Sequence, residues 1–270
     1  MQENKIGDYE LLGSLGRGGF GNVYKAKTID GDIVALKRLN PHLLDNPDIV
    51  RRFLNEANIL SKLKHSNICR LIEFFPDGPD YTIVLEHIDG MDLKKMMQKH
   101  PDNMIPFERA IKIAGECISA FQYAYENGIL HRDIKPSNIM IAKNGQSKIT
   151  DFGTAVTEWE EAALDANGMM SASYSAPERF STEKNIDVRS DIYSLGIVFY
   201  ELFTGKLPFD AIDVSEIISW HVNNTPLPAD FYNPCLPPEI TCAIKTSLEK
   251  KPENRFKDFS ELKKAMMPEL

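Results

Sequence analysis

Polar and hydrophobic positions alternate in the first third of the chain, whereas hydrophobic positions recur every three to four residues in the rest. Alternation is typical of half-buried strands, and the longer period is typical of amphipathic helices. The change of period predicts a small β-rich lobe at residues 1–87 and a larger, mainly helical lobe at residues 88–270. We therefore expect an α+β fold in which two lobes enclose a cleft.

Strands are predicted where alternating segments lie between turn-forming residues. The Asp30-Gly31 pair is a strong hairpin signal between two of these segments. The predicted strands cover residues 9–15, 21–28, 33–39, 71–75, 82–86 and 139–141.

Helices are predicted from their start and stop signals. Asn46 can cap a helix that has Pro47 at its first position and runs to about residue 63. Gly128 and Gly205 each follow a periodic stretch, where glycine commonly ends a helix. The other predicted helices cover residues 92–100, 106–127, 187–204, 213–222, 237–249 and 258–267.

Composition narrows the class of protein. The 270 residues are enough for a real core, and the net charge of −8 argues against a nucleic-acid-binding protein. None of the four cysteines forms a C-x-x-C pair, which favours reduced thiols in a cytoplasmic protein. The longest apolar stretch, residues 192–203, is too short to span a bilayer and predicts a buried helix. We expect no membrane segment in this chain and no signal peptide at its start.

A glycine-rich segment lies between the first two long strands. Residues 16–21 read Gly-Arg-Gly-Gly-Phe-Gly, which fits G-x-G-x-x-G. A dinucleotide fingerprint would need a helix after the last glycine, but alternating residues follow instead. The segment therefore predicts a flexible turn whose N–H groups can cover phosphates. A plain hairpin turn is the alternative.

One lysine and one glutamate are predicted to form a buried ion pair. Lys37 shares a strand face with Ala35, and Glu56 falls on the apolar stripe of the helix after Pro47. A buried carboxylate is costly unless it is paired, and Lys37 is the obvious partner. The alternative is that Glu56 lies at the edge of the stripe, in solvent.

A group of polar residues lies between two apolar elements. Residues 131–138 read His-Arg-Asp-Ile-Lys-Pro-Ser-Asn, and Asp151-Phe152-Gly153 follows further along. Asp133, Asn138 and Asp151 supply a base and two oxygen ligands in this order. Oxygen ligands suit Mg²⁺, which a triphosphate needs for charge neutralisation.

Together these segments resemble the eukaryotic-type serine/threonine protein kinase catalytic domain, over essentially the whole chain. Ala176-Pro177-Glu178 completes the ordered set of motifs. Asp191 matches the aspartate that anchors the catalytic loop in that family. Arg255 matches the arginine that pairs with the glutamate of the Ala-Pro-Glu motif, here Glu178.

The resemblance implies Mg²⁺-dependent transfer of the ATP γ-phosphate to serine or threonine hydroxyls of a protein substrate. It implies that Asp133 is the base, that Lys135 neutralises the γ-phosphate, and that Glu56 holds Lys37 against the α- and β-phosphates. It also implies that Asn138 and Asp151 hold Mg²⁺. The nucleotide-binding set is completed by Leu15, Gly16, Gly18, Gly19, Phe20, Gly21, Val23, Ala35, Leu85, Glu86, Ile88, Asp92 and Met140.

Serine/threonine specificity follows from Lys135, two residues after Asp133, and from Ser171, five residues before Ala176. Within the family, Arg132 often binds a phosphate on the activation loop. Residues 158–170 contain no hydroxyl residue, so we hypothesise that a carboxylate pairs with Arg132 instead, Asp165 first and Glu160 or Glu161 next. A solvated acidic loop is the alternative.

Two further readings stay open. The first is a pseudokinase that binds ATP as a regulatory module; such a protein usually lacks Lys37, Asp133 or Asp151, and this chain has all three. The second is a kinase that phosphorylates small molecules, which would lack the Ala-Pro-Glu segment. We expect a monomer, with room for a regulatory partner.

Overall fold

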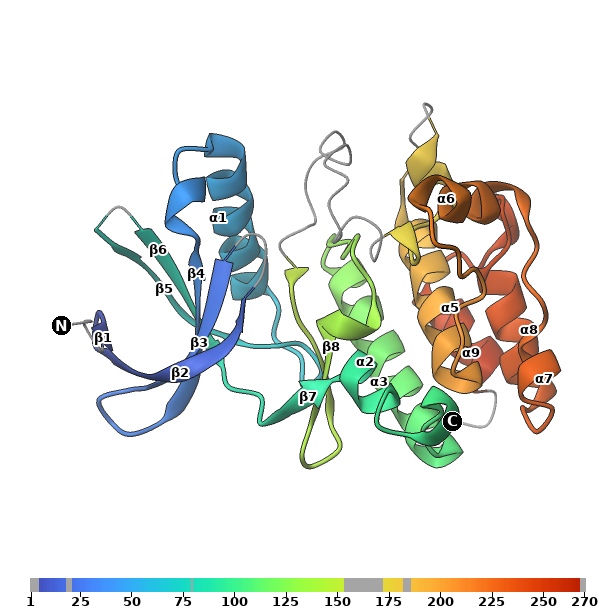
Figure 1. Cartoon of the computed structure of the whole chain (residues 1–270), viewed down its shortest axis with the longest axis horizontal. Helices are drawn as coiled ribbons and strands as arrows, with labels where there is room; N and C mark the ends of the chain where they lie inside the picture. Colours follow the sequence, from blue (N-terminus) through green and yellow to red (C-terminus); the bar gives the residue numbers. More distant parts are fainter. Residues whose placement is uncertain (1–4, 18–20, 79, 153–171, 182–185, 268–270) are drawn as a thin grey trace.

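A computed structural model describes residues 5–17, 21–78, 80–152, 172–181 and 186–267. Within these residues, the strands of one sheet gather at one end of the molecule and most helices at the other (Figure 1). The predicted α+β fold with two lobes is confirmed.

The small lobe is built on a six-stranded antiparallel sheet in the order β1-β2-β3-β4-β6-β5. The two-residue β1 was not predicted, because so short a segment has no readable period. The strands are β1 (Lys5–Ile6), β2 (Tyr9–Arg17), β3 (Gly21–Lys27), β4 (Ile33–Leu39), β5 (Leu71–Asp77) and β6 (Asp80–Glu86).

Helix α1 (Pro47–Lys62) begins where the sequence predicts. Oδ1 of Asn46 accepts hydrogen bonds from the backbone N–H groups of Asp48 and Ile49, at 3.1 and 3.3 Å. This cap satisfies two donors that have no partner within the helix. Phe53, Glu56, Ala57, Ile59 and Leu60 are buried, which places Glu56 among apolar side chains.

A second sheet of three short antiparallel strands lies between the small lobe and the helices of the large lobe (Figure 1). It consists of β7 (Gly90–Asp92), β8 (Ile139–Ala142) and β9 (Ser147–Ile149). Only β8 was predicted, because three-residue strands carry no alternation that can be told from chance.

The helices of the large lobe follow the predicted order. The helix expected at residues 92–100 is shorter: α2 begins after Asp92, which caps it, and ends before Gln98. Five short 3₁₀ helices in the described residues each begin with proline, which suits a first helical position: η1 (Pro41–Leu43), η2 (Pro101–Asn103), η3 (Pro136–Asn138), η5 (Pro177–Phe180) and η6 (Pro252–Asn254). The α-helices are α2 (Leu93–Met97), α3 (Phe107–Glu126), α5 (Val188–Thr204), α6 (Val214–Asn223), α7 (Ala229–Tyr232), α8 (Pro238–Ser247) and α9 (Phe259–Met266).

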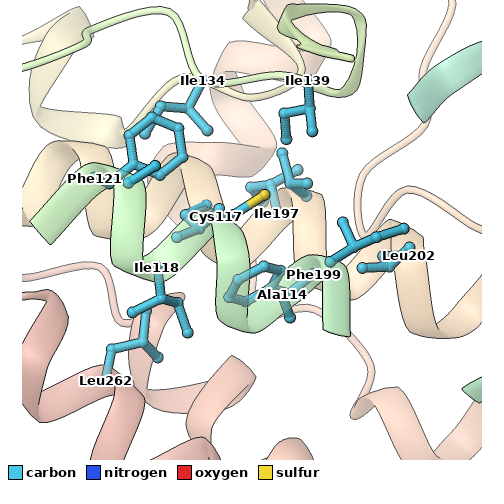
Figure 2. Packing of buried hydrophobic residues seen from close by; sticks show 14 of the residues in the cluster. Ala114, Cys117, Ile118, Phe121, Ile134, Ile139, Ile197, Phe199, Leu202 and Leu262 are labelled. Atoms are coloured by element: carbon cyan, nitrogen blue, oxygen red, sulfur yellow. The ribbon is translucent and has the colours of Figure 1, made fainter. Parts of the chain in front are cut away.

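Helix α5 is the centre of the large lobe, and all of its residues from Ile192 to Phe203 except Glu201 are buried. Helix α3 packs against α5 through Ala114 and Cys117, while Leu262 of α9 covers its other side (Figure 2). Gly196 lets α8 approach closely, since a Cβ there would lie 2.7 Å from the Cβ of Ser247. A stretch that is apolar on all sides is therefore explained by burial on all sides.

In the part of the chain that the structure describes, no helix combines the length and apolar character that a bilayer crossing needs. All four cysteines are free thiols, with Cys69 and Cys117 buried and Cys235 and Cys242 exposed.

A fully buried histidine, His221 of α6, predicts how stability depends on pH. Burial and the nearby Lys250 ammonium lower the pKa of His221 from 6.5 to about 4. As the pH falls below 6.5, the imidazole of His221 is therefore protonated in the unfolded chain before it is protonated in the folded protein. This difference leaves the free energy of unfolding unaffected above pH 6.5 and lowers it progressively towards pH 4. The loss amounts to about 3 kcal/mol.

Urea unfolding of the wild type and of His221→Asn, measured at several values between pH 4 and 7.5, tests this prediction. We expect the wild type to lose more unfolding free energy between pH 6.5 and 4 than the variant, which has no imidazole to protonate. Parallel curves for the two proteins would contradict it.

Candidate active site

Lys37 of β4 lies between two carboxylates from different parts of the chain. Its Nζ is 2.7 and 2.9 Å from the two carboxylate oxygens of Glu56 on α1, so the pairing predicted from the sequence is present. The same Nζ is 2.6 Å from Oδ1 of Asp151, which follows β9. This second contact joins the small lobe to the large one.

Electrostatics favour the charged forms of Lys37 and Asp151, whereas burial raises the pKa of Glu56 despite the nearby Lys37 ammonium. Burial alone would lower the pKa of Lys37, but the charges of Asp151 and Glu56 outweigh it and raise the pKa well above its usual value. The Lys37 ammonium lowers the pKa of Asp151 against the effect of burial. The side chain of Asp151 remains 47% exposed, whereas that of Glu56 is 5% exposed. The Asp151 carboxylate is thus accessible from solvent, whereas the buried Glu56 carboxylate holds Lys37 from helix α1.

Asp191 of α5 holds the segment that carries Asp133 through hydrogen bonds to its backbone. The buried carboxylate of Asp191 accepts the backbone N–H groups of His131 and Arg132, at 2.7 and 2.9 Å. His131 is buried, and its Nε2 lies 3.0 Å from the carbonyl oxygen of Thr150. Because a carbonyl only accepts, Nε2 carries the proton and Nδ1 accepts the N–H of Asp133, at 3.3 Å.

Two residues of this site have left-handed backbone conformations that side chains seldom adopt. Arg132 has φ = 63° and Asp151 has φ = 59°. Such conformations cost on the order of 1–3 kcal/mol each and persist where the surroundings enforce them. Here the hydrogen bond that the N–H of Arg132 donates to Asp191 and the ion pair of Asp151 with Lys37 provide that enforcement.

Asp133 faces two hydrogen-bond donors. Its Oδ2 lies 2.7 Å from Nζ of Lys135 and 3.0 Å from Nδ2 of Asn138. Asn138 also donates to the carbonyl oxygen of Asp133, at 2.9 Å. The side chains of Asp133 and Lys135 are 18% and 20% exposed, so a reactant can reach both.

The residues predicted to hold Mg²⁺ have a suitable donor set. Nδ2 of Asn138 donates both of its hydrogen bonds to Asp133, so the side-chain carbonyl oxygen of Asn138 is the atom that could ligate the ion. Lys37 approaches Oδ1 of Asp151, whose side chain as a whole is 47% exposed. Among the described residues, no group of three or more His, Cys, Asp or Glu could hold a metal alone. A magnesium ion held by one amide and one carboxylate oxygen needs further oxygens from water and phosphate, which is its usual mode.

Four of the predicted nucleotide-binding positions lie on one face of the six-stranded sheet. Strand register pairs Ala35 with Leu85 and Val23 with Lys37, so these four side chains share a face. Met140 is paired with Asp92 in the second sheet. The described members that lie outside this group are Leu15 and Gly16 on β2, Gly21 at the start of β3, Glu86 at the end of β6, and Ile88 in the connection to β7.

Three of these positions have structural roles that the sequence did not reveal. A Cβ on Gly21 would lie 2.1 Å from the carbonyl oxygen of Arg38, so strand packing alone requires this glycine. Asp92 caps α2 by accepting the N–H of Lys95 at 2.8 Å, and it pairs with the Lys95 ammonium. The N–H of Glu86 donates to the carbonyl oxygen of Arg70 at 3.0 Å.

Lys148 of β9 is a site residue that the sequence reasoning missed. Its Nζ lies 2.7 Å from Oε1 of Glu86, which also accepts the N–H of Arg70 at 2.8 Å. The pair ties the end of β6 to the large lobe. One signal was available in the sequence: Lys148 is a charged residue three positions before Asp151 of the Asp-Phe-Gly motif.

A second ion pair lies beneath the Ala-Pro-Glu segment. Arg255 donates to both carboxylate oxygens of Glu178, at 2.7 and 2.9 Å, and its side chain is fully buried. Burial would raise the pKa of Glu178, but Arg255 outweighs it and the pKa is lowered. Arg179 donates to the carbonyl oxygen of Arg132, which connects this segment to the catalytic loop.

Several predictions concern residues outside the described part of the chain. Gly18, Gly19 and Phe20 belong to this group, as do Ser171 and the carboxylates proposed for Arg132. These assignments stay predictions.

Comparison with known proteins agrees with this geometry. Residues 9–266 match the protein kinase domain family. A probable serine/threonine-protein kinase of Clostridium acetobutylicum is 35% identical over 256 residues, which cover 94% of this chain and 38% of that protein. The serine/threonine-protein kinase PrkC of Bacillus subtilis is 35% identical over 260 residues, covering 93% and 38%. This chain thus spans about two fifths of the length of these relatives.

The kinase domain of PknI from Mycobacterium tuberculosis has the same fold, with a TM-score of 0.74 at 24% identity over 98% of each chain. The match covers the segments that bring Lys37, Asp133 and Asp151 together. By sequence, by fold and by the order of its motifs, this chain belongs to the protein kinase family.

Proposed function

We propose that this domain is a serine/threonine protein kinase that transfers the γ-phosphate of ATP to protein hydroxyls. The observation that carries the proposal is the joining of two clusters across the lobes. Lys37, Glu56 and Asp151 form one charged cluster, and Asp133 with Lys135 forms the other. The curated relatives are serine/threonine kinases, which supports the same reaction class.

The hydroxyl oxygen of the substrate forms a bond to the γ-phosphorus while Asp133 accepts the hydroxyl proton. The bond between the γ-phosphorus and the oxygen that it shares with the β-phosphate breaks, and ADP leaves. Lys135 lies beside this carboxylate and neutralises charge on the transferred group. Such a reaction is accelerated mainly by positioning and electrostatic stabilisation. Lys135 next to Asp133 also supports serine and threonine over tyrosine as acceptors.

Asn138 and Asp151 would hold Mg²⁺, and the bound ion would neutralise phosphate charge. Glu56 holds Lys37 in reach of the α- and β-phosphates. We assign the nucleotide to the face that carries Val23, Ala35 and Leu85, with Met140 opposite. The set is completed by Leu15, Gly16, Gly18, Gly19, Phe20, Gly21, Glu86, Ile88 and Asp92, whose contacts with the nucleotide are proposals.

We further propose that residues 1–87 and 88–270 are the two lobes of one kinase domain. The domain acts as a monomer in the cytoplasm, where ATP and reduced thiols coexist, and takes a protein as its substrate.

Incubation with γ-labelled ATP, Mg²⁺ and dephosphorylated casein tests the function. We expect label on serine and threonine of casein, and loss of labelling when EDTA removes Mg²⁺. Nucleotide binding without transfer would favour the pseudokinase reading, and label on tyrosine would overturn the acceptor assignment.

The Lys148–Glu86 pair leads to a separate prediction. Without the lysine, Glu86 can turn to solvent and the backbone beside the proposed nucleotide site loses one constraint. A pair this little exposed contributes on the order of 1 kcal/mol, so we expect Lys148→Met to raise the KM for ATP about fivefold. Steady-state kinetics and calorimetric titration with an ATP analogue measure the effect. Lys148→Arg keeps the charge and should behave as the wild type; equal KM values for all three proteins would refute the prediction.

A further inference from the structure

His221 of α6 connects three parts of the large lobe that are distant in sequence. Its side chain is fully buried. Its Nδ1 lies 2.8 Å from the hydroxyl oxygen of Tyr193 on α5, and its Nε2 lies 3.1 Å from the carbonyl oxygen of Ser173. The ring also meets that of Phe209 edge-on, with centroids 5.0 Å apart. Both ring nitrogens are therefore engaged, and the ring cannot turn without losing a hydrogen bond.

The partners fix the tautomer of this imidazole. A carbonyl oxygen can only accept, so Nε2 must carry the hydrogen and donate it to Ser173. Nδ1 is then an acceptor, and the hydroxyl of Tyr193 donates to it. A neutral ring with one defined tautomer satisfies both contacts, and the lowered pKa of His221 agrees with the neutral form.

The backbone of His221 is fixed as well. The ammonium of Lys250 donates to its carbonyl oxygen at 2.8 Å and lies over the ring of Phe209, 4.7 Å from the centroid. The carbonyl oxygen of Lys250 in turn accepts a hydrogen bond from Arg255, at 2.9 Å. The backbone of His221 is thus linked through Lys250 to the buried Arg255–Glu178 ion pair.

The carbonyl that His221 holds belongs to the segment next to the catalytic loop. Ser173 is followed by Tyr174, whose hydroxyl donates to Glu201 of α5 at 2.5 Å. The segment continues to Arg179, which donates to the carbonyl oxygen of Arg132, beside Asp133. Residues 173–179 therefore lie beside the loop that carries Asp133, and His221 fixes the carbonyl of the first of them.

We propose that His221 is a positioning residue that holds the Ser173 carbonyl and thereby sets the affinity of the domain for its protein substrate. This inference rests on the proposed kinase function. His221 touches neither ATP nor the reacting atoms, so its loss should act on substrate affinity and leave nucleotide affinity unchanged.

Two substitutions, His221→Gln and His221→Asn, distinguish the effect of the hydrogen bond to Ser173 from the effect of losing the imidazole ring. The amide nitrogen of glutamine reaches about as far as Nε2 and can still donate to the carbonyl, whereas asparagine reaches only as far as Nδ1. We expect His221→Asn to raise the KM for dephosphorylated casein about tenfold, with kcat changed less than threefold, since one buried hydrogen bond is lost. His221→Gln should stay within about threefold of the wild type. Both variants should bind an ATP analogue as the wild type does.

Hydrogen exchange of the amides at residues 172–176 provides a readout that needs no activity. We expect faster exchange in His221→Asn and near-normal exchange in His221→Gln. If His221→Asn does not fold, Tyr193→Phe replaces it: it removes the donor to Nδ1, and we expect a two- to threefold rise in the KM for casein with faster exchange at residues 172–176.

Unchanged exchange and unchanged KM in the foldable variant would overturn the proposal, as would an equal loss of affinity for the ATP analogue. If the wild type phosphorylates no casein, the kinase assignment has failed its own test. The exchange comparison then still decides whether His221 holds this segment.

Discussion

Replacing Asp133 by asparagine is expected to lower kcat for phosphoryl transfer about 10³-fold while nucleotide affinity stays within about twofold. Asparagine keeps the size of the side chain and an oxygen that Lys135 and Asn138 can still approach. It cannot accept the proton of the substrate hydroxyl. Because Lys37 is held by Glu56 and Asp151, the proposed phosphate-binding cluster should be undisturbed.

Single-turnover transfer from γ-labelled ATP to casein measures this effect, and titration with an ATP analogue checks nucleotide affinity. Asp48→Asn is the matched control, because Asp48 is an exposed carboxylate in the first turn of α1. A decrease of less than tenfold for Asp133→Asn would mean that another group takes the proton. An equal decrease for Asp48→Asn would point to a general loss of folded protein.

The second large effect concerns stability. Arg255→Met should lower the free energy of unfolding by about 3–5 kcal/mol, because it leaves the Glu178 carboxylate buried without its partner. Arg255 also donates to the backbone carbonyl oxygens of Arg189, Glu249 and Lys250, so three further acceptors lose a donor. We expect the melting temperature to fall by about 10 °C.

Thermal and urea unfolding followed by circular dichroism measure the change. Arg51→Met is the matched control, since the Arg51–Asp48 pair is exposed and should contribute less than about 0.5 kcal/mol. A double replacement of Arg255 and Glu178 by methionine should recover part of the loss, because no charge is then left unpaired. Equal destabilisation by Arg255→Met and Arg51→Met would refute the assignment of this pair as a structural centre.

Long periodic elements were predicted well from the sequence, and very short ones were not. Strand β4 and helices α1, α3 and α5 begin and end within one or two residues of their predicted bounds. The strands β7 and β9 were missed because three residues define no period. Helix α2 was predicted too long, because it ends at Met97 and residues 98–100 form a turn that the sequence did not distinguish from helix.

The candidate site divides in the same way. The pairing of Lys37 with Glu56 was predicted. A carboxylate on the apolar stripe of a helix needs a partner, and Lys37 shares a strand face with the apolar Ala35. The contact between Lys37 and Asp151 was not predicted, although both residues were. Lys148 and His221 were not predicted as site residues, since neither lies in a recognisable motif.

The sequence by itself determined the fold class, the order of the motifs and which residue types bear the proposed chemistry. These depend on period, burial and turn residues, all of which are local in the chain. Only the tertiary structure decided that Lys37 meets Asp151, that Lys148 ties β6 to β9, and that His221 meets the carbonyl of Ser173. The physical reason is that a hydrogen bond depends on distances of a few tenths of an ångström and on direction, which arise only when remote elements pack together.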